Sequence, residues 1–121
     1  MKKATRDFGE IERRVKRFRD ERDWKQFHKP KDLAASVAIE AAEILEHFQW
    51  KTDDECARYV ANEENRDAVA QEMADVLILL VSAADVMGVD LYTATLAKIE
   101  ENGRKYPVAK AKGNATKYDR L

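Results

Sequence analysis

The sequence contains little of what breaks or crosslinks a chain: among 121 residues there are one cysteine, two prolines and four glycines. The lone Cys56 excludes a disulfide within the chain, and the scarcity of proline and glycine favours long, uninterrupted elements. The longest apolar run, from Val76 to Val81, is far too short to cross a bilayer. The sequence therefore predicts a protein without a membrane-spanning helix.

An excess of charge of one sign is also missing, since 22 basic residues face 23 acidic ones and the net charge is −1. This balance gives no electrostatic argument for binding a nucleic acid polymer. The residues from Met1 to Phe8 are partly basic but no apolar segment follows them, so no secretory signal is predicted. Together with the single cysteine, this favours a cytoplasmic location.

What the chain has is helical periodicity. Apolar residues at spacings of three and four predict a first helix from about Thr5 to Trp24. Pro30 interrupts the pattern, because the residue before a proline is steered out of the α region. Further helices are predicted over residues 32–49, 52–62, 66–87 and 91–105, and no strand-length run alternates with period two. The expected fold is all-α, a bundle of four to five helices.

Capping residues set the expected boundaries. Asp32 is the predicted N-cap of the second helix, and the segment Thr52 to Glu55 has the pattern of a capping box. Gly88 is the predicted C-cap of the long helix, Asp90 caps the last helix, and Pro107 ends it. The chain is thus predicted to form one helical domain over residues 1–107, followed by a basic, flexible tail over 108–121.

The segment from Val76 to Val81 is apolar on every side rather than along one stripe. A small bundle has difficulty burying such a helix all round. We expect part of this helix to pack against another copy of the chain, so that the fold is assembled into a helical homo-oligomer. A fully central helix in a monomer is the alternative.

Acidic residues occur where apolar ones are expected. Glu40 and Glu43 lie three residues apart in an otherwise apolar helix, and Glu72 and Asp75 repeat that spacing in the next long helix. Residues three apart share a helix face. Two like charges about 4 Å apart repel by roughly 4 kcal/mol at an effective dielectric constant of about 20. Such carboxylates either take up protons, pair with lysine or arginine, or hold a cation such as Mg²⁺.

At these residues the chain resembles the all-α nucleotide pyrophosphohydrolases of the MazG-like superfamily, and especially their dCTP pyrophosphatase branch. The signature of that family is a Glu-x-x-Glu helix followed by Glu-x-x-Asp. Here the two motifs are Glu40-Ala-Ala-Glu43 and Glu72-Met-Ala-Asp75. Similar segments also occur at residues 18–28, 46–50, 75–78 and 102–107, so the resemblance covers residues 15–120.

The resemblance implies a Mg²⁺-dependent enzyme, with Mn²⁺ as a substitute, that hydrolyses a (deoxy)nucleoside triphosphate to the monophosphate and pyrophosphate. dCTP or a related or modified dNTP is the favoured substrate, and the role is house-cleaning of the nucleotide pool. The family also assembles as a homo-oligomer, usually a tetramer built as a dimer of dimers. No nucleic acid polymer and no membrane are expected as partners.

The same resemblance assigns roles to individual residues. The implied metal ligands are Glu40, Glu43, Glu72 and Asp75. The residues implied to contact phosphates or sugar are Lys98, Asn102, Arg104 and Tyr106. The residues implied to line the base and sugar pocket are Trp24, His28 and Trp50.

Three positions depart from the family pattern. Ile39 precedes Glu40 where many members have a second glutamate, as is common in the dCTP branch. Leu79 stands where dCTP pyrophosphatases often have a tyrosine associated with the sugar pocket, so strict preference for deoxyribose and cytosine does not follow from the resemblance. His47 occupies a position that is usually apolar; it shares a face with the acids of its helix, and an exposed or core histidine is the simpler interpretation.

No serine, cysteine or histidine is placed as a nucleophile with a base partner. Water activated on the metal is the expected attacker, with a carboxylate as proton acceptor: Glu43 is the candidate and Glu46 the runner-up. A ferritin-like di-metal oxidase would need Glu-x-x-His motifs, which are missing here. The alternative that stays open is a non-catalytic helical oligomerisation or adaptor module with incidental acidic pairs.

Overall fold

The computed structural model describes residues 6–121, and every regular element in that range is a helix, which confirms the predicted all-α class. The α-helices are α1 (Phe8–Glu21), α2 (Pro30–Glu46), α3 (Asp53–Ala61), α4 (Glu63–Met87), α5 (Leu91–Lys105) and α6 (Val108–Ala111). Short 3₁₀ turns occupy Lys25–Phe27 and Tyr118–Arg120. The helix beyond the four to five predicted is α6, which has only four residues. Thr5, the predicted start of the first helix, lies outside the described residues.

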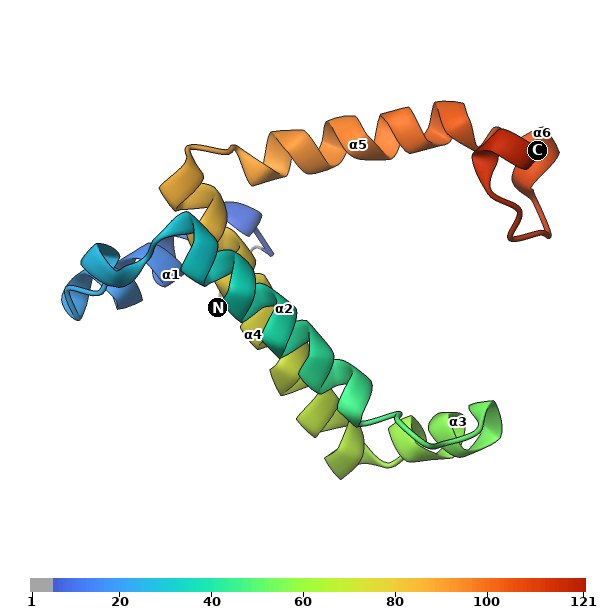
Figure 1. Ribbon diagram of the computed structural model, residues 1–121, viewed down its shortest axis with the longest axis horizontal. Coiled ribbons are helices and arrows are strands. Elements are labelled where there is room, and N and C mark those ends of the chain that lie inside the picture. Colours follow the sequence, from blue (N-terminus) through green and yellow to red (C-terminus); the bar gives the residue numbers. More distant parts are fainter. Residues whose placement is uncertain (1–5) are drawn as a thin grey trace, which may run out of the picture. The chain divides into compact units, whose positions relative to one another are not determined.

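The chain divides into two compact units, the first ending at Gly88 and the second spanning Val89–Leu121. In the first unit α2 and α4 lie side by side and run in opposite directions, and α1 and α3 each pack on α4 (Figure 1). The second unit contains α5 and α6. The domain boundary predicted at residue 107 falls inside this unit, and the flexibility of residues 108–121 stays a prediction.

Within the described range no helix is both long and apolar enough to span a membrane.

Most helix boundaries lie where the capping residues predict them. The capping box is present, since the Glu55 amide donates to Thr52 Oγ1 (3.2 Å) and the Thr52 amide donates to Glu55 Oε1 (3.3 Å). Gly88 ends α4 in the left-handed conformation (φ +68°), and the Asp90 side chain caps α5. Asn62 caps α4 with its side-chain oxygen, so this helix begins earlier than predicted.

Two boundaries differ from the prediction. The first helix ends at Glu21 rather than Trp24, because Asp23 adopts the left-handed conformation (φ 54°) and turns the chain. The second helix begins at Pro30, so Asp32 lies inside its first turn and is not the N-cap. Proline suits the first helical position because its fixed φ is helical and its missing N–H needs no partner there. The N-cap is instead Lys29, which makes no side-chain cap bond.

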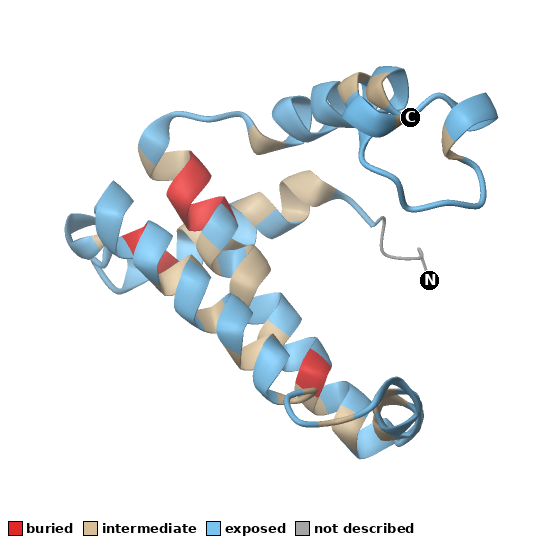
Figure 2. Cartoon of the chain, turned by 45° about the vertical axis from the view of Figure 1, so that its right-hand side comes forward, coloured by how far each residue is buried: buried red, intermediate tan, exposed pale blue. Residues whose placement is uncertain are grey.

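The core of the chain is small for its length. Among the described residues, those that are both apolar and buried are Leu33, Val69, Val81, Ala83 and Ala84. Most of the ribbon in Figure 2 is exposed, and large apolar side chains on the two long helices lie at the surface, including Ile39 (60% exposed), Leu45 (65%) and Met73 (54%). The apolar segment of α4 is divided in the same way, because Val81 is 3% exposed but Ile78 is 44% exposed.

A buried ion pair fastens α1 to the C-terminal end of α4. The Arg19 side chain is only 6% exposed, and its Nη1 donates to Asp85 Oδ2 while its Nε donates to Asp20 Oδ1 (2.9 Å). Lys16 Nζ lies 3.3 Å from Asp85 Oδ1. The hydrogen bond from Arg19 is the main reason that the pKa of Asp85 lies below its usual value. A buried guanidinium of this kind is strongly destabilising once its carboxylate is removed.

We expect Asp85→Asn to lower the free energy of unfolding at pH 7 by about 2 kcal/mol, less than the ~3–5 kcal/mol of fully buried pairs, because water screens a partly exposed carboxylate. A carboxylate with a lowered folded-state pKa stabilises above its unfolded pKa, and that contribution is lost as the pH falls through the folded-state pKa. The difference in unfolding free energy between wild type and variant should therefore narrow in acid. Urea denaturation followed by circular dichroism at pH 7 and pH 3, at one protein concentration, checks this.

The control is Asp67→Asn, which changes an exposed carboxylate on α4. This variant should unfold like the wild type at both pH values. An Asp85→Asn deficit of equal size at pH 7 and pH 3 would contradict the role given to the charge of Asp85.

Candidate metal centre

Three glutamates meet between α2 and α4. Glu40 and Glu43 share one face of α2, and the antiparallel α4 brings Glu72 opposite them. Each offers one carboxylate oxygen, and these three oxygens lie within 4.8 Å of one another. All three side chains are half-buried, and the Oε2 atoms of Glu40 and Glu72 are buried without a hydrogen-bond partner. The sequence spacing and the pairing of the two helices thus produce one cluster of oxygen ligands.

The electrostatics of the cluster show how closely the acids are pressed together. Partial burial and the charge of Glu43 raise the pKa of Glu40. A hydrogen bond shared with Glu43, followed by burial, raises the pKa of Glu72. Within residues 6–121, neither lysine nor arginine forms an ion pair with Glu40, Glu43 or Glu72. An unpaired set of oxygen ligands of this charge suits a hard divalent cation.

The two other acids named from the sequence lie at the edge of this cluster. Asp75 is exposed, and its charge contributes to raising the pKa values of both Glu40 and Glu72. Glu46 lines one cavity together with Glu43 and Glu72. The structure therefore brings three of the four predicted metal ligands within 4.8 Å of one another and places Asp75 within electrostatic reach of them.

A polar cavity of about 330 Å³ opens beside the cluster at the C-terminal end of α2. Besides the glutamates, His47, Lys51 and Tyr59 line it. Neither Lys51 nor Tyr59 is among the site residues that the sequence predicts. The capping box at the start of α3 indicates only that a new helix begins there. The direction in which α3 points, and so the position of Tyr59 beside α2, depends on packing rather than on local sequence.

An apolar cavity of about 320 Å³ lies at the other end of the helix pair, and Phe18, Trp24, His28 and Leu79 are among its lining residues. The Phe18 and Trp24 rings pack edge to face with their centroids 5.7 Å apart. The Nδ1 atom of His28 is buried and has no hydrogen-bond partner. The structure thus places two predicted pocket residues, Trp24 and His28, in one cavity. Leu79, which departs from the family pattern, lines the same cavity.

Trp50 does not join this cavity. It follows the C-terminal end of α2, whereas Trp24 precedes the N-terminal end, and 17 helical residues separate them. The residue is 92% exposed, and its backbone adopts the left-handed conformation (φ 68°) that L-amino acids seldom take. Within its own protomer Trp50 therefore lines neither cavity.

The predicted phosphate-contacting residues, Lys98, Asn102, Arg104 and Tyr106, belong to the second unit. Lys98 Nζ lies 3.3 Å from Glu101 Oε2, and the Asn102 carbonyl accepts from the Tyr106 amide (2.8 Å). The Tyr106 ring packs edge to face on Tyr118. The carboxylates lie in the first unit, so the role of these four residues stays a prediction.

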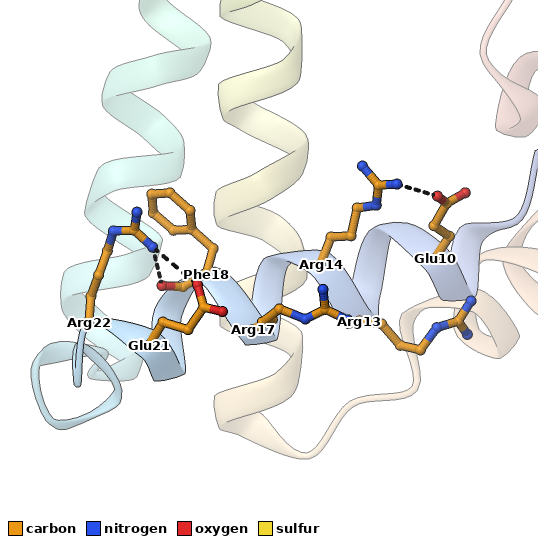
Figure 3. A pocket seen from close by; sticks show the side chains of 7 residues that line it. All are labelled: Glu10, Arg13, Arg14, Arg17, Phe18, Glu21 and Arg22. Carbon is orange, nitrogen blue, oxygen red and sulfur yellow. Dashed lines mark hydrogen bonds and ion pairs between the residues drawn. The ribbon is translucent and has the colours of Figure 1, made fainter.

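A third hollow lies on α1 alone and is rich in arginine (Figure 3). Its charges are partly balanced within the helix, since Arg14 Nη2 lies 2.9 Å from Glu10 Oε1 and Arg22 Nη1 lies 3.9 Å from Glu21 Oε2. The Arg22 guanidinium also lies over the Phe18 ring, 3.7 Å from its centroid. Because residues of α1 and its C-cap, Arg22, form the whole lining, this hollow is a surface feature of α1 and not part of the carboxylate centre.

The fold and the site together define an all-helical protein with a carboxylate cluster on an antiparallel helix pair. The MazG-like family matches residues 35–121, and the chain belongs to this family. A solved structure of a pyrophosphatase from Archaeoglobus fulgidus DSM 4304 has a similar fold, with a TM-score of 0.76 and 39% sequence identity. The likeness covers 88% of this chain and 98% of that one.

Curated relatives are also similar. Over 112 residues, which are 93% of this chain, the sequence is 41% identical to dCTP pyrophosphatase 1 of Bos taurus and 41% identical to that of Homo sapiens. The matched region spans 66% of the length of each of these relatives.

We expect Glu72→Gln to raise the thermal unfolding midpoint in the absence of divalent cations, because it removes one negative charge from a repelling cluster. Added MgCl₂ should raise the midpoint of the wild type, since a ligand that binds the folded state stabilises it. The variant should gain less from the same addition. Differential scanning fluorimetry with chelator and across a MgCl₂ series measures both effects.

Glu64→Gln is the matched control, since Glu64 is an exposed glutamate in the first turn of the same helix. Its Mg²⁺ response should equal that of the wild type. An equal Mg²⁺ response in Glu72→Gln would remove Glu72 from the metal centre.

Proposed function

We propose that this protein is a Mg²⁺-dependent nucleoside triphosphate pyrophosphohydrolase that cleaves between the α and β phosphates, releasing a nucleoside monophosphate and pyrophosphate. The observation that carries the proposal is the meeting of Glu40, Glu43 and Glu72 within 4.8 Å, with buried oxygens that lack partners. Membership of the MazG-like family and the similarity to proteins named dCTP pyrophosphatase 1 support it. House-cleaning of a cytoplasmic nucleotide pool is the proposed role.

The donor set fits the proposed ion. Carboxylate oxygens are the ligands that Mg²⁺ prefers, and Mn²⁺ accepts the same set. The raised pKa values of Glu40 and Glu72 show that negative charge is crowded here, which is the condition that a dication relieves. Glu40, Glu43, Glu72 and Asp75 would hold the metal. When bound, it supplies neutralisation of the triphosphate and acidification of a water molecule.

Carboxylate side chains of the protein are the proposed proton acceptors. Glu43 is the proposed acceptor of the proton that the attacking water releases, and Glu46 is the second candidate. Both carboxylates line the cavity beside the cluster, which supports either as the acceptor of a proton from a water molecule in that cavity.

The apolar cavity is the proposed site for the nucleoside. Leu79 follows Asp75 by one turn of α4, about 6 Å along the helix axis, so this cavity begins next to the carboxylates. Trp24 offers an aromatic face and His28 a buried ring nitrogen without a partner. The wall at Leu79 carries no hydroxyl for the sugar. We propose dCTP or a related or modified dNTP as the substrate, in line with the names of the curated relatives.

We also propose that the chain functions as a homo-oligomer, a tetramer built as a dimer of dimers. Exposed apolar side chains on both long helices support this, with Leu45 on α2 and Leu80 on α4 as examples (65% and 39% exposed). Large exposed apolar side chains are enriched where folded proteins contact one another.

With Mg²⁺, the purified protein should convert at least one dNTP into the monophosphate and pyrophosphate, with no orthophosphate. Asp75→Asn should keep the helical circular dichroism spectrum but lose about 100-fold or more in kcat/KM, because the metal loses a charged ligand. Ion-exchange separation of the products across a nucleotide panel, with and without chelator, measures this.

Asp67→Asn, an exposed Asp-to-Asn change on the same helix, should keep wild-type turnover. Inertness of every nucleotide in Mg²⁺ would remove the enzymatic function and favour the adaptor alternative. Unchanged turnover in Asp75→Asn would remove only Asp75 from the metal centre.

The mass in solution should be a multiple of the 13.9 kDa protomer. We expect Leu80→Glu to lower that mass, because a charge placed in an apolar contact is left desolvated and unpaired. Light scattering after size-exclusion chromatography measures it, with Glu64→Lys as an exposed polar control. A monomeric wild type would contradict the proposed assembly.

A further inference from the structure

The polar cavity beside the carboxylates contains three side chains to which the proposed reaction has so far given no role. Lys51, His47 and Tyr59 line it together with Glu43, Glu46 and Glu72. Its volume of about 330 Å³ corresponds to roughly ten water molecules at the ~30 Å³ that each occupies in the liquid. The cavity is therefore large enough for a small polyanion, and the side chains that line it are the surface that such a ligand would contact.

The ammonium group of Lys51 is fixed in position by its neighbours but keeps N–H donors that bind nothing in the described part of the chain. Its Nζ donates to the His47 carbonyl (2.8 Å) and lies over the Tyr59 ring, 4.7 Å from the centroid. An ammonium group has three N–H donors. Among the described residues Lys51 forms no ion pair, although three glutamates line the same cavity. Its position is thus fixed by an aromatic ring and a backbone carbonyl, and donors remain for a ligand.

Tyr59 and His47 add a second fixed donor. The Tyr59 hydroxyl and His47 Nδ1 are 2.7 Å apart, and their ring centroids are 5.8 Å apart. If Nδ1 accepts the hydroxyl proton, the imidazole Nε2–H is left as a donor. If Nδ1 carries the proton, the hydroxyl of Tyr59 is left as one. In either tautomer one N–H or O–H of the pair stays available, and the Phe48 ring packs against Tyr59 to hold it in place.

Along the helix pair, the polar cavity lies on the opposite side of the carboxylates from the apolar cavity. On α4, Leu79 in the apolar cavity lies seven residues, about 10 Å, beyond Glu72. The helix α2 runs antiparallel to α4 (Figure 1). His47, the C-cap of α2, lies four residues, about 6 Å, beyond Glu43, and therefore in the opposite direction in space. The apolar cavity, the carboxylates and the polar cavity therefore follow one another. A nucleoside triphosphate has the same order of base, scissile α-phosphate and terminal phosphates.

We propose that Lys51, Tyr59 and His47 form the binding site for the β and γ phosphates of the substrate and for the pyrophosphate that leaves. This inference rests on the proposed pyrophosphohydrolase function. In the step concerned, a water oxygen forms a bond to the α-phosphorus and the bond from that phosphorus to the bridging oxygen breaks. The electron pair stays on the bridging oxygen, now part of pyrophosphate, and the proton of the water passes to a carboxylate. Lys51 stabilises the charge that the leaving group gains.

Lys51→Met tests the charge, because methionine keeps most of the aliphatic stem. Inhibition constants for inorganic pyrophosphate and for dCMP are measured with the full-length protein in Mg²⁺, together with the Mg²⁺ dependence of the thermal unfolding midpoint. We expect binding of pyrophosphate to weaken by about 10- to 100-fold, as for the loss of a charge-assisted hydrogen bond. Binding of dCMP and the response to Mg²⁺ should stay as in the wild type. Lys31→Met, an exposed lysine on α2, is the matched control and should change neither.

Tyr59→Phe gives an independent test, because it keeps the ring beneath the ammonium group and removes only the hydroxyl. Pyrophosphate should bind about three- to tenfold more weakly, as for a neutral hydrogen bond. This variant decides the matter if Lys51→Met does not fold, and Lys51→Arg should restore pyrophosphate binding at least in part.

The outcomes separate this proposal from the one on which it rests. If the wild type releases pyrophosphate from a dNTP but both variants bind pyrophosphate as tightly as the wild type does, the cavity is not the phosphate site while the enzymatic function stands. Equal losses for pyrophosphate and dCMP would also overturn it, because they indicate general damage to the centre. If no dNTP is cleaved, the function itself fails, and calorimetry of pyrophosphate binding to wild type and Lys51→Met still decides whether the cavity binds it.

Discussion

The mutual repulsion of the glutamates between α2 and α4 is the constraint on which the rest of this structure depends. The antiparallel packing of these two helices presses Glu40, Glu43 and Glu72 together and raises the pKa values of Glu40 and Glu72. Helix pairs ordinarily place apolar residues at such positions. The arrangement costs stability in the single chain, and under the proposed function a dication and a polyphosphate would offset that cost by neutralising each other at this site.

The same helix pair also explains why the two cavities differ. At the C-terminal end of α4 the pair is crossed by α1, which contributes Phe18 and is fastened there by the buried Arg19–Asp85 pair. At the opposite end α3 folds back and contributes Tyr59. An apolar, aromatic hollow and a polar, cationic one thus flank a single set of carboxylates, and a ligand with one apolar and one anionic end meets complementary surroundings at each.

Local sequence determined those features that depend on few residues. The capping box of α3, the left-handed Gly88 and the cap at Asp90 are all correct because each rests on contacts within one turn. The start of α2 was missed because Lys29 caps it without a side-chain bond. The acids of α2 were expected on one face, since helical geometry alone requires it. The meeting of His47 with Tyr59 was not foreseen, because twelve residues and a change of helix direction separate them.

The backbone at Trp50 has a consequence for what its indole does. An L-residue in the left-handed region is held at an energetic cost that glycine would largely avoid. The ring gains almost nothing in return from its own chain, because Trp50 is 92% exposed. Selection for the stability of the single chain would thus favour glycine at this turn, because the contacts of the indole within its own chain do not offset the cost of this backbone.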